Sequence, residues 1–113
     1  MTEQELNKRR ARWVWGKKNI RGSCNSRFLC YIDSDGNHMA VPNFPDYINA
    51  CFEWLVPKFH AWTIGSTPDG DICAVVVLKK DIRGEACAEE TAIALCQALD
   101  KALDKLINSE VKP

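Results

Sequence analysis

Six cysteines and two histidines are the side chains best suited to nucleophilic or metal chemistry. Cysteine catalysis needs a thiolate beside a base that a third group orients, and a structural zinc site uses closely spaced cysteine pairs. The spacing of His38 and His60 indicates no such base, and no two cysteines have Cys-x-x-Cys spacing. We therefore expect no metal, no cofactor, structural or surface histidines, and reduced thiols that fill the core. The cysteines are Cys24, Cys30, Cys51, Cys73, Cys87 and Cys96.

The acidic and glycine-containing segments also lack a recognisable active site. Asp33–Asn37 begins like a calcium loop but lacks the required glycine and the final acidic residue, so a hairpin turn is favoured. The chain has no phosphate-binding loop, nucleophile elbow or His-Glu-x-x-His motif. Glu89 and Glu90 stand at a helix start, where the helix dipole accounts for them. We predict that the protein is not an enzyme.

The first 27 residues are strongly basic. They carry eight Lys or Arg and two Glu, a net charge of +6, whereas the whole chain is neutral. Basic side chains interleaved with tryptophans can follow a phosphate backbone and stack on bases. The alternative is a solvated helix face whose tryptophans belong to the core, and the sequence leaves both open. The candidate nucleic-acid-binding or partner-binding residues are Arg9, Arg10, Arg12, Trp13, Trp15, Lys17 and Lys18.

Signals in the N-terminal third predict a helix followed by a hairpin. Thr2 and Glu5 have capping-box spacing, and Gly16 suits a helix end, so a helix is expected from Glu3 to about Trp15. Residues 17–26 show no period and are expected to form a loop. Strands are expected at 27–33 and 38–41, joined by a turn at Asp35-Gly36.

A second helix, a second hairpin and a long closing helix are expected after residue 43. The second helix ends at Pro57 and carries one apolar stripe of Phe44, Ile48, Cys51, Phe52 and Leu55. Ala61–Ser66 predicts a strand with Trp62 and Ile64 on one face, and the run 72–78 is apolar without alternation. Such a strand needs cover on both faces. Residues 81–85 are expected to form a loop before the closing helix.

This element order predicts an α+β fold. We expect a three-layer α/β/α sandwich, in which a mostly antiparallel sheet of about four strands has helices on both faces. The chain is expected to form one domain overall, with a basic helix and loop at 1–27 and the sandwich core at 28–113. Its length allows a substantial core, and it has no apolar run long enough to span a membrane. The polar first twelve residues are unlike a signal peptide, so we expect a cytoplasmic protein.

Two segments resemble the phage ABA sandwich domain family, which comprises small proteins of phages and prophages. They are VPNFPDYINACFEWLV, from Val41, and GEACAEETAIALCQALDKAL, from Gly84. Phe44 stands where the family commonly has tyrosine. The resemblance covers about two-thirds of the chain and implies a layered helix and sheet fold, a bacterial host cell and no particular activity. The matching residues are Pro42, Phe44, Asp46, Asn49, Ala50 and Glu53 in the first segment, and Ala88, Thr91, Ala94 and Ala98 in the second.

Three kinds of function follow from these observations. The first is a phage or prophage accessory protein that acts by non-catalytic binding to a host or phage macromolecule, for example as an inhibitor of a host defence factor. The second is a nucleic-acid-binding module that uses the basic N-terminal arm. The third is a binding protein, monomeric or homo-oligomeric, that sequesters a small anionic molecule in a pocket between helices and sheet. No membrane partner is expected.

Overall fold

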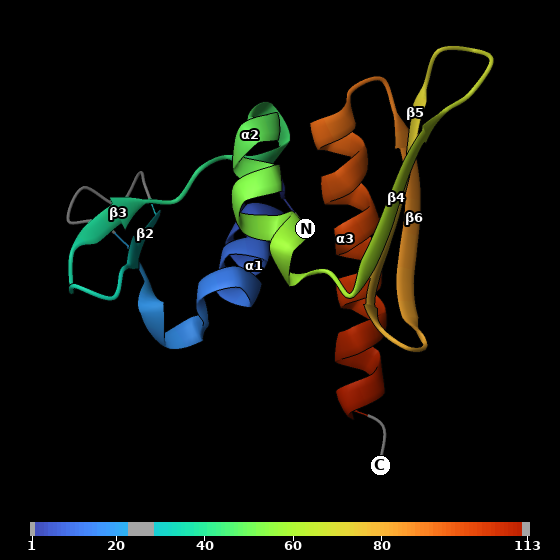
Figure 1. Cartoon of the computed structure of the whole chain (residues 1–113). Coiled ribbons are helices and arrows are strands. Elements are labelled where there is room, and N and C mark those ends of the chain that lie inside the picture. Colours follow the sequence, from blue (N-terminus) through green and yellow to red (C-terminus); the bar gives the residue numbers. More distant parts are fainter. Residues whose placement is uncertain (1, 23–28, 112–113) are drawn as a thin grey trace. The chain divides into compact units, whose positions relative to one another are not determined.

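The chain folds into two compact units, Met1–Asn43 (unit 1) and Phe44–Pro113 (unit 2). The computed structural model describes residues 2–22 and 29–111 (Figure 1). In the structure the first hairpin belongs with the N-terminal helix in unit 1. The expected single domain, with a basic helix and loop at 1–27 and a core at 28–113, stays a prediction. The fold is mixed α+β, with two three-stranded antiparallel sheets instead of one sheet of about four strands.

Unit 1 begins with the helix α1 (Glu3–Trp15), and its predicted bounds are confirmed. The Thr2 hydroxyl oxygen accepts a hydrogen bond from the backbone N–H of Glu5 at 3.2 Å, which satisfies one of the first-turn donors. At the other end, Gly16 adopts a φ of 88° and its N–H donates to the carbonyl of Arg12. A side chain is strained at that φ, so glycine suits this helix end.

The sheet of unit 1 contains β1 (Ile20–Gly22), β2 (Leu29–Ile32) and β3 (His38–Ala40) in that order. The predicted hairpin is confirmed, with Gly36 at φ 84° in its turn. The loop expected over residues 17–26 is wrong in part, because the 3₁₀ helix η1 (Lys17–Asn19) and β1 occupy residues 17–22, while residues 23–26 lie outside the described residues. Strand β1 has three residues, too few for a sequence period to reveal.

Unit 2 opens with a helical segment that changes type along its length. It comprises η2 (Phe44–Asp46), α2 (Ile48–Ala50), the π-helical turn η3 (Cys51–Leu55) and η4 (Val56–Lys58). The sequence predicted one helix ending at Pro57. Proline has no N–H to donate, and the chain tightens into the 3₁₀ turn that contains it.

The sheet of unit 2 is formed by β4 (Ala61–Ser66), β5 (Ile72–Lys79) and β6 (Ile82–Ala88), and α3 (Thr91–Val111) closes the unit. The first two strands are confirmed. The loop expected at residues 81–85 is wrong except at Asp81, because Asp81 lies in a tight turn and β6 begins at Ile82. The glycine that suggested a loop, Gly84, has a packing role instead.

Gly84 lies at a close approach of β6 to α3. A Cβ atom at this position would lie 2.6 Å from the backbone N of Ala102 and 3.0 Å from Cβ of Lys101, and still closer to the carbonyl oxygen of Ala98. The facing side of α3 carries alanines four residues apart, which are fully buried. Small side chains on both elements therefore allow helix and strand to pack closely.

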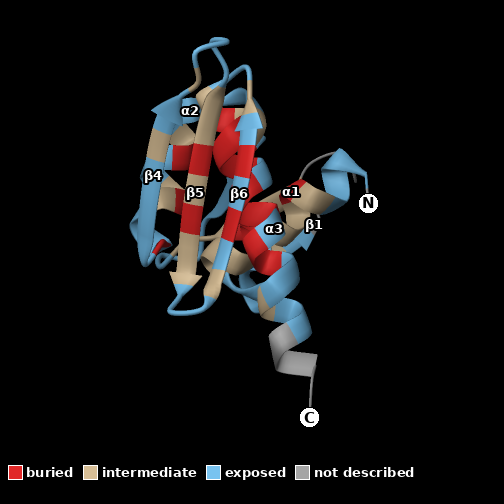
Figure 2. Ribbon diagram, turned by 90° about the vertical axis from the view of Figure 1, so that its right-hand side faces the viewer, coloured by how far each residue is buried: buried red, intermediate tan, exposed pale blue. Residues whose placement is uncertain are grey.

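Within the described residues of unit 2, helices cover one face of the sheet, so the expected α/β/α layering is not confirmed. Helix α3 packs against β5 and β6 and also contacts the helical segment 44–58 (Figure 1). In unit 2, α3 therefore lies between the sheet and the helical segment. Along β5, Ala74 and Val76 are buried, whereas Val75 and Val77 on the opposite face are half-buried (Figure 2). The non-alternating sequence concealed this difference.

A disulfide joins Cys73 of β5 to Cys87 of β6, which contradicts the expectation that all six cysteines are reduced. The two residues are directly opposite in the strand register, with Cα atoms 4.0 Å apart. The sequence could not show this pairing because β6 was not foreseen. Cys30, Cys51 and Cys96 are free, as expected, and Cys24 lies outside the described residues.

Candidate protein-binding surface

The histidines and remaining cysteines form no metal-binding cluster in the part of the chain that the structure describes. There, no group of three His, Cys, Asp or Glu is placed to hold a metal. His38 and His60 are exposed. The free thiols of Cys51 and Cys96 are both buried in unit 2, with sulfur atoms 3.9 Å apart. Of the helices within residues 2–22 and 29–111, none is long and apolar enough to cross a membrane.

Two of the seven candidate binding residues, the buried Arg10 and the half-buried Trp15, make contacts within unit 1. The Arg10 side chain is 1% exposed, and its guanidinium donates a 2.9 Å hydrogen bond to the Glu3 carboxylate. The Trp15 ring stacks on Tyr31 of β2, with centroids 4.0 Å apart and planes inclined by 5°. In this conformation neither the Arg10 charge nor the Trp15 face that lies on Tyr31 is available to a partner.

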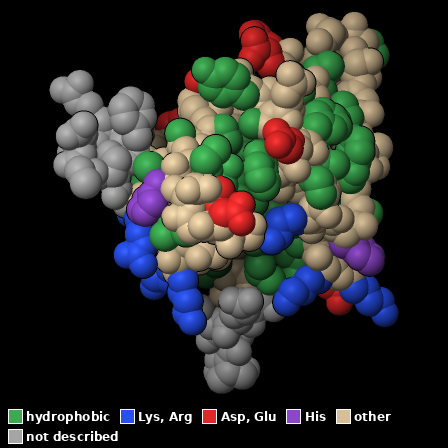
Figure 3. Space-filling view, turned by 60° about the vertical axis from the view of Figure 1, so that its left-hand side comes forward, with side chains coloured by type: hydrophobic (Ala, Val, Ile, Leu, Met, Phe, Trp, Pro, Cys, Tyr) green, Lys and Arg blue, Asp and Glu red, His purple; other side chains and the backbone are tan. Residues whose placement is uncertain are grey.

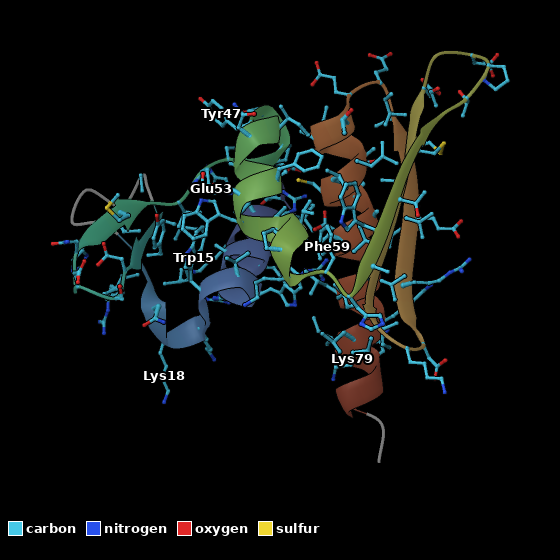
Figure 4. All side chains as sticks on the ribbon, viewed as in Figure 1. Trp15, Lys18, Tyr47, Glu53, Phe59 and Lys79 are labelled. Atoms are coloured by element: carbon cyan, nitrogen blue, oxygen red, sulfur yellow. A yellow bond between two sulfur atoms is a disulfide. The ribbon has the colours of Figure 1, made fainter. Side chains whose placement is uncertain are left out.

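The other five candidates differ in exposure. Arg12, Lys17 and Lys18 are exposed, while Arg9 and Trp13 are half-buried. Figure 4 shows Lys18 pointing away from the ribbon. The structure thus leaves exposed basic residues around the end of α1, whereas the Trp15 ring stacks on Tyr31 within unit 1.

The most distinctive surface of unit 2 is apolar. We call it the apolar surface and define it by Tyr47, Ile48, Phe52 and Trp62, which are 60%, 37%, 38% and 42% exposed. Tyr47 precedes α2 and projects from the end of the helical segment (Figure 4). Figure 3 shows hydrophobic side chains at the surface as green groups among acidic and basic ones. Neighbouring exposed hydrophobic residues mark interaction sites more often than single ones do.

An aromatic contact links the helical segment to β4. The rings of Phe52 and Trp62 meet edge to face, with centroids 5.6 Å apart and planes inclined by 77°. Such a pair is favourable, and it holds both side chains in place although each is more than one-third exposed. Little side-chain freedom is then left to lose on binding, and aromatic anchors of this kind dominate many protein interfaces.

Sequence reasoning assigned two residues of this surface to the core. The predicted stripe counted Ile48 and Phe52 with Phe44, Cys51 and Leu55, but only the last three are fully buried. Ile48 and Phe52 are four residues apart and share a separate face of the helical segment. The predicted stripe contains two adjacent residues, at 51 and 52, and is therefore wider than one packing partner can cover. This width is the sequence feature that could have shown that part of the stripe is exposed.

A hollow between β6 and α3 carries mixed charge. Arg83, Lys101 and Lys105 line it together with Glu85 and Asp104. Arg83 forms an ion pair with Glu85 at 2.6 Å, and both side chains are more than half exposed. The hollow is open and about 530 Å³ in volume. Its place beside β6 and α3 fits the expected pocket between helix and sheet.

Comparison with known proteins finds a fold relative and no family. No known family matches the chain, and no curated protein sequence matches it. The resemblance to the phage ABA sandwich family is therefore not confirmed. A crystal structure of a phage protein from Bacillus cereus ATCC 14579 is similar, with a TM-score of 0.63 and 15% identity. The likeness covers 90% of this chain and 92% of that one, and it shows a shared fold.

Proposed function

We propose that the chain is a phage-encoded or prophage-encoded accessory protein that acts by binding another protein, without catalysis. The observation that carries the proposal is the apolar surface, where four large hydrophobic side chains of unit 2 are between 37% and 60% exposed. Exposing them to water is unfavourable unless a partner covers them. The phage protein of similar fold supports the origin.

A capture experiment with matched variants tests this proposal. The purified chain is immobilised and exposed to a bacterial lysate, and retained proteins are identified by mass spectrometry. Replacing Ile48 and Phe52 together by Ser should abolish retention, because it removes adjacent apolar contacts from one helix face. Ile107→Ser is the control, since Ile107 is also exposed, at 44%, but lies near the end of α3. Equal retention by all three proteins, or retention by none, would reject the proposal.

Inhibition of a host defence factor is the biological setting that we propose for this binding. Expression of the chain in a bacterium that resists a phage should then restore plaque formation. The Ile48/Phe52 variant should fail to do so, whereas Ile107→Ser should succeed. Restoration by the Ile48/Phe52 variant would separate any such effect from the apolar surface.

Binding of nucleic acid by unit 1 is a second candidate, favoured by its exposed basic residues. Replacing Arg12, Lys17 and Lys18 by Gln should leave the thermal midpoint nearly unchanged, because exposed charges contribute little to stability. It should lower the slope of log K against log salt by up to about three, since each lost phosphate contact removes close to one. Arg10 stays unchanged because it is buried. No binding at ~50 mM salt, where such contacts are strongest, would exclude this candidate.

The hollow beside β6 supports the third candidate, sequestration of a small anion, less well. Its three basic side chains are accompanied by two carboxylates. Calorimetric titration with inorganic phosphate and a nucleotide tests it, with Lys101→Gln and Lys105→Gln expected to weaken any heat signal. A signal that persists in both variants would place the anion elsewhere.

A further inference from the structure

The outer edge of β4 presents backbone groups in a fixed alternation. The N–H of Thr67 donates to the carbonyl of Asp71, which continues the register that pairs Gly65 with Cys73. Hydrogen-bonded and non-hydrogen-bonded pairs alternate along antiparallel strands. Residues 61, 63 and 65 therefore bond to β5, and the N–H and C=O groups of Trp62, Ile64 and Ser66 point to the open edge.

The cross-strand disulfide supports the same assignment. The N–H and C=O groups of one residue both point to the same neighbouring strand. Because those of Cys73 point to β4, Cys73 and Cys87 of β6 form a non-hydrogen-bonded pair. Such pairs bring opposite Cα atoms to about 4.5 Å, and these two lie 4.0 Å apart. The hydrogen bond beside β4 and the Cα distance beside β6 thus give the same result, that Cys73 directs its N–H and C=O groups to β4.

The edge of β4 lacks the features that keep sheet edges apart. Its sequence, Ala-Trp-Thr-Ile-Gly-Ser, has no charge and no proline, and five of its six residues are exposed. Natural edges are commonly protected by charged residues, proline or bulges. Among the described residues, no strand pairs with this edge.

The opposite edge of the sheet is protected. On β6 the outward-facing backbone groups belong to Arg83, Glu85 and Cys87, and the first two carry charged side chains. A symmetric pairing centred on Glu85 would set two carboxylates directly opposite each other, which is unfavourable. The corresponding pairing of β4, centred on Ile64, sets two isoleucines opposite each other.

We propose that the open edge of β4 binds a second copy of this chain. The two β4 strands pair antiparallel about a two-fold axis at Ile64, with each Trp62 opposite the partner's Ser66. This register uses all outward groups of the three residues and forms about six hydrogen bonds. In a two-fold interface the same surface of both copies meets. A strand without charged residues suits such an interface because no like charges are brought together. The two three-stranded sheets join into one of six strands.

The pairing also changes the apolar surface. Trp62 and Ile64 lie on the face of the sheet that α3 covers, because they pair with Val76 and Ala74. A two-fold axis perpendicular to the sheet keeps these faces on the same side. The helical segments of both copies then lie on one side of the joined sheet, and their Ile48 and Phe52 side chains offer a partner two equivalent sites.

The mass of the purified chain in solution tests the pairing without any partner, and hence independently of the proposed function. Sedimentation equilibrium over a range of concentrations should show twice the chain mass of 12.8 kDa. Ser66→Pro removes one outward donor from each copy and leaves bonding to β5 intact, so it should weaken the dimer roughly tenfold or more. Glu85→Pro, at the outward donor of the other edge, is the matched control and should have no effect.

Amide hydrogen exchange gives a second measurement that needs no substitution. The amides of Trp62, Ile64 and Ser66 should exchange more slowly as concentration rises, while those of Arg83, Glu85 and Cys87 should not change. A monomer at every concentration, or a dimer that Ser66→Pro leaves intact while these amides stay unprotected, would overturn the proposal. Protection that appears only when a different protein is added would assign the edge to that protein, and would also overturn it.

Discussion

Truncating Val76 and Val75 separately measures how each face of the unit 2 sheet is covered. Val76 is 0% exposed beneath α3. Its replacement by Ala removes two methyl groups, each about 0.8 kcal/mol when buried, and leaves a cavity that α3 cannot fill. We expect a loss of about 2–3 kcal/mol in the free energy of unfolding. Urea denaturation followed by circular dichroism should show a lower midpoint with an unchanged slope.

Val75→Ala is the matched control for this experiment. The same two methyl groups are removed one residue away, but from the half-buried face that no helix of unit 2 covers. The loss should be less than half of that for Val76→Ala, because water already reaches the site and no closed cavity forms. Equal losses would show that both faces are covered equally and would refute the one-sided layering.

Three further results are expected. Gly84→Ala should cost more than 2 kcal/mol by thermal or urea unfolding, because the clash is with the backbone of α3, which no side-chain rotation relieves; a change below 0.5 kcal/mol would contradict this packing. Thr2→Ala should lower the stability of unit 1 by about 1 kcal/mol through loss of the helix cap, and Thr2→Ser should retain it. Peptide mapping without reductant should recover Cys73 linked to Cys87, with Cys51 and Cys96 free to alkylate after unfolding; six alkylated cysteines would contradict the disulfide.

Much of the fold was predictable because local signals and final structure agree. The bounds of α1 followed from its cap residues, and β4 followed from a run of strand-forming residues between two turns. The failures have particular causes. Strand β1 is short, and β6 contains Gly84 and the charged residues Arg83 and Glu85, so neither shows the hydrophobic pattern of a strand. Both are held by pairing with neighbours that a local sequence window does not contain.

The candidate site was less predictable because exposure depends on packing partners. Charge and tryptophan content pointed to the N-terminal arm. In the structure, however, Arg10 forms an ion pair with Glu3, and the Trp15 ring stacks on Tyr31. Tyr31 lies on a strand after the helix, and nothing in the sequence indicates that it stacks on Trp15. From the helical pattern alone, Ile48 and Phe52 look like core residues. Only the position of α3 shows which apolar face of the helical segment is buried and which is exposed.

The close approach at Gly84 limits how sequences with this fold can diverge. Most packing constraints are shared between side chains, so a larger residue on one side can be offset by a smaller one on the other. Here the opposing atoms include the Ala98 carbonyl oxygen and the Ala102 nitrogen, and no substitution makes a backbone smaller. A sequence that keeps this helix-to-strand distance must therefore keep glycine at this position. Position 84 is thus fixed by the backbone of α3 and not by any side chain, so repacking of neighbouring side chains cannot make room for a larger residue there.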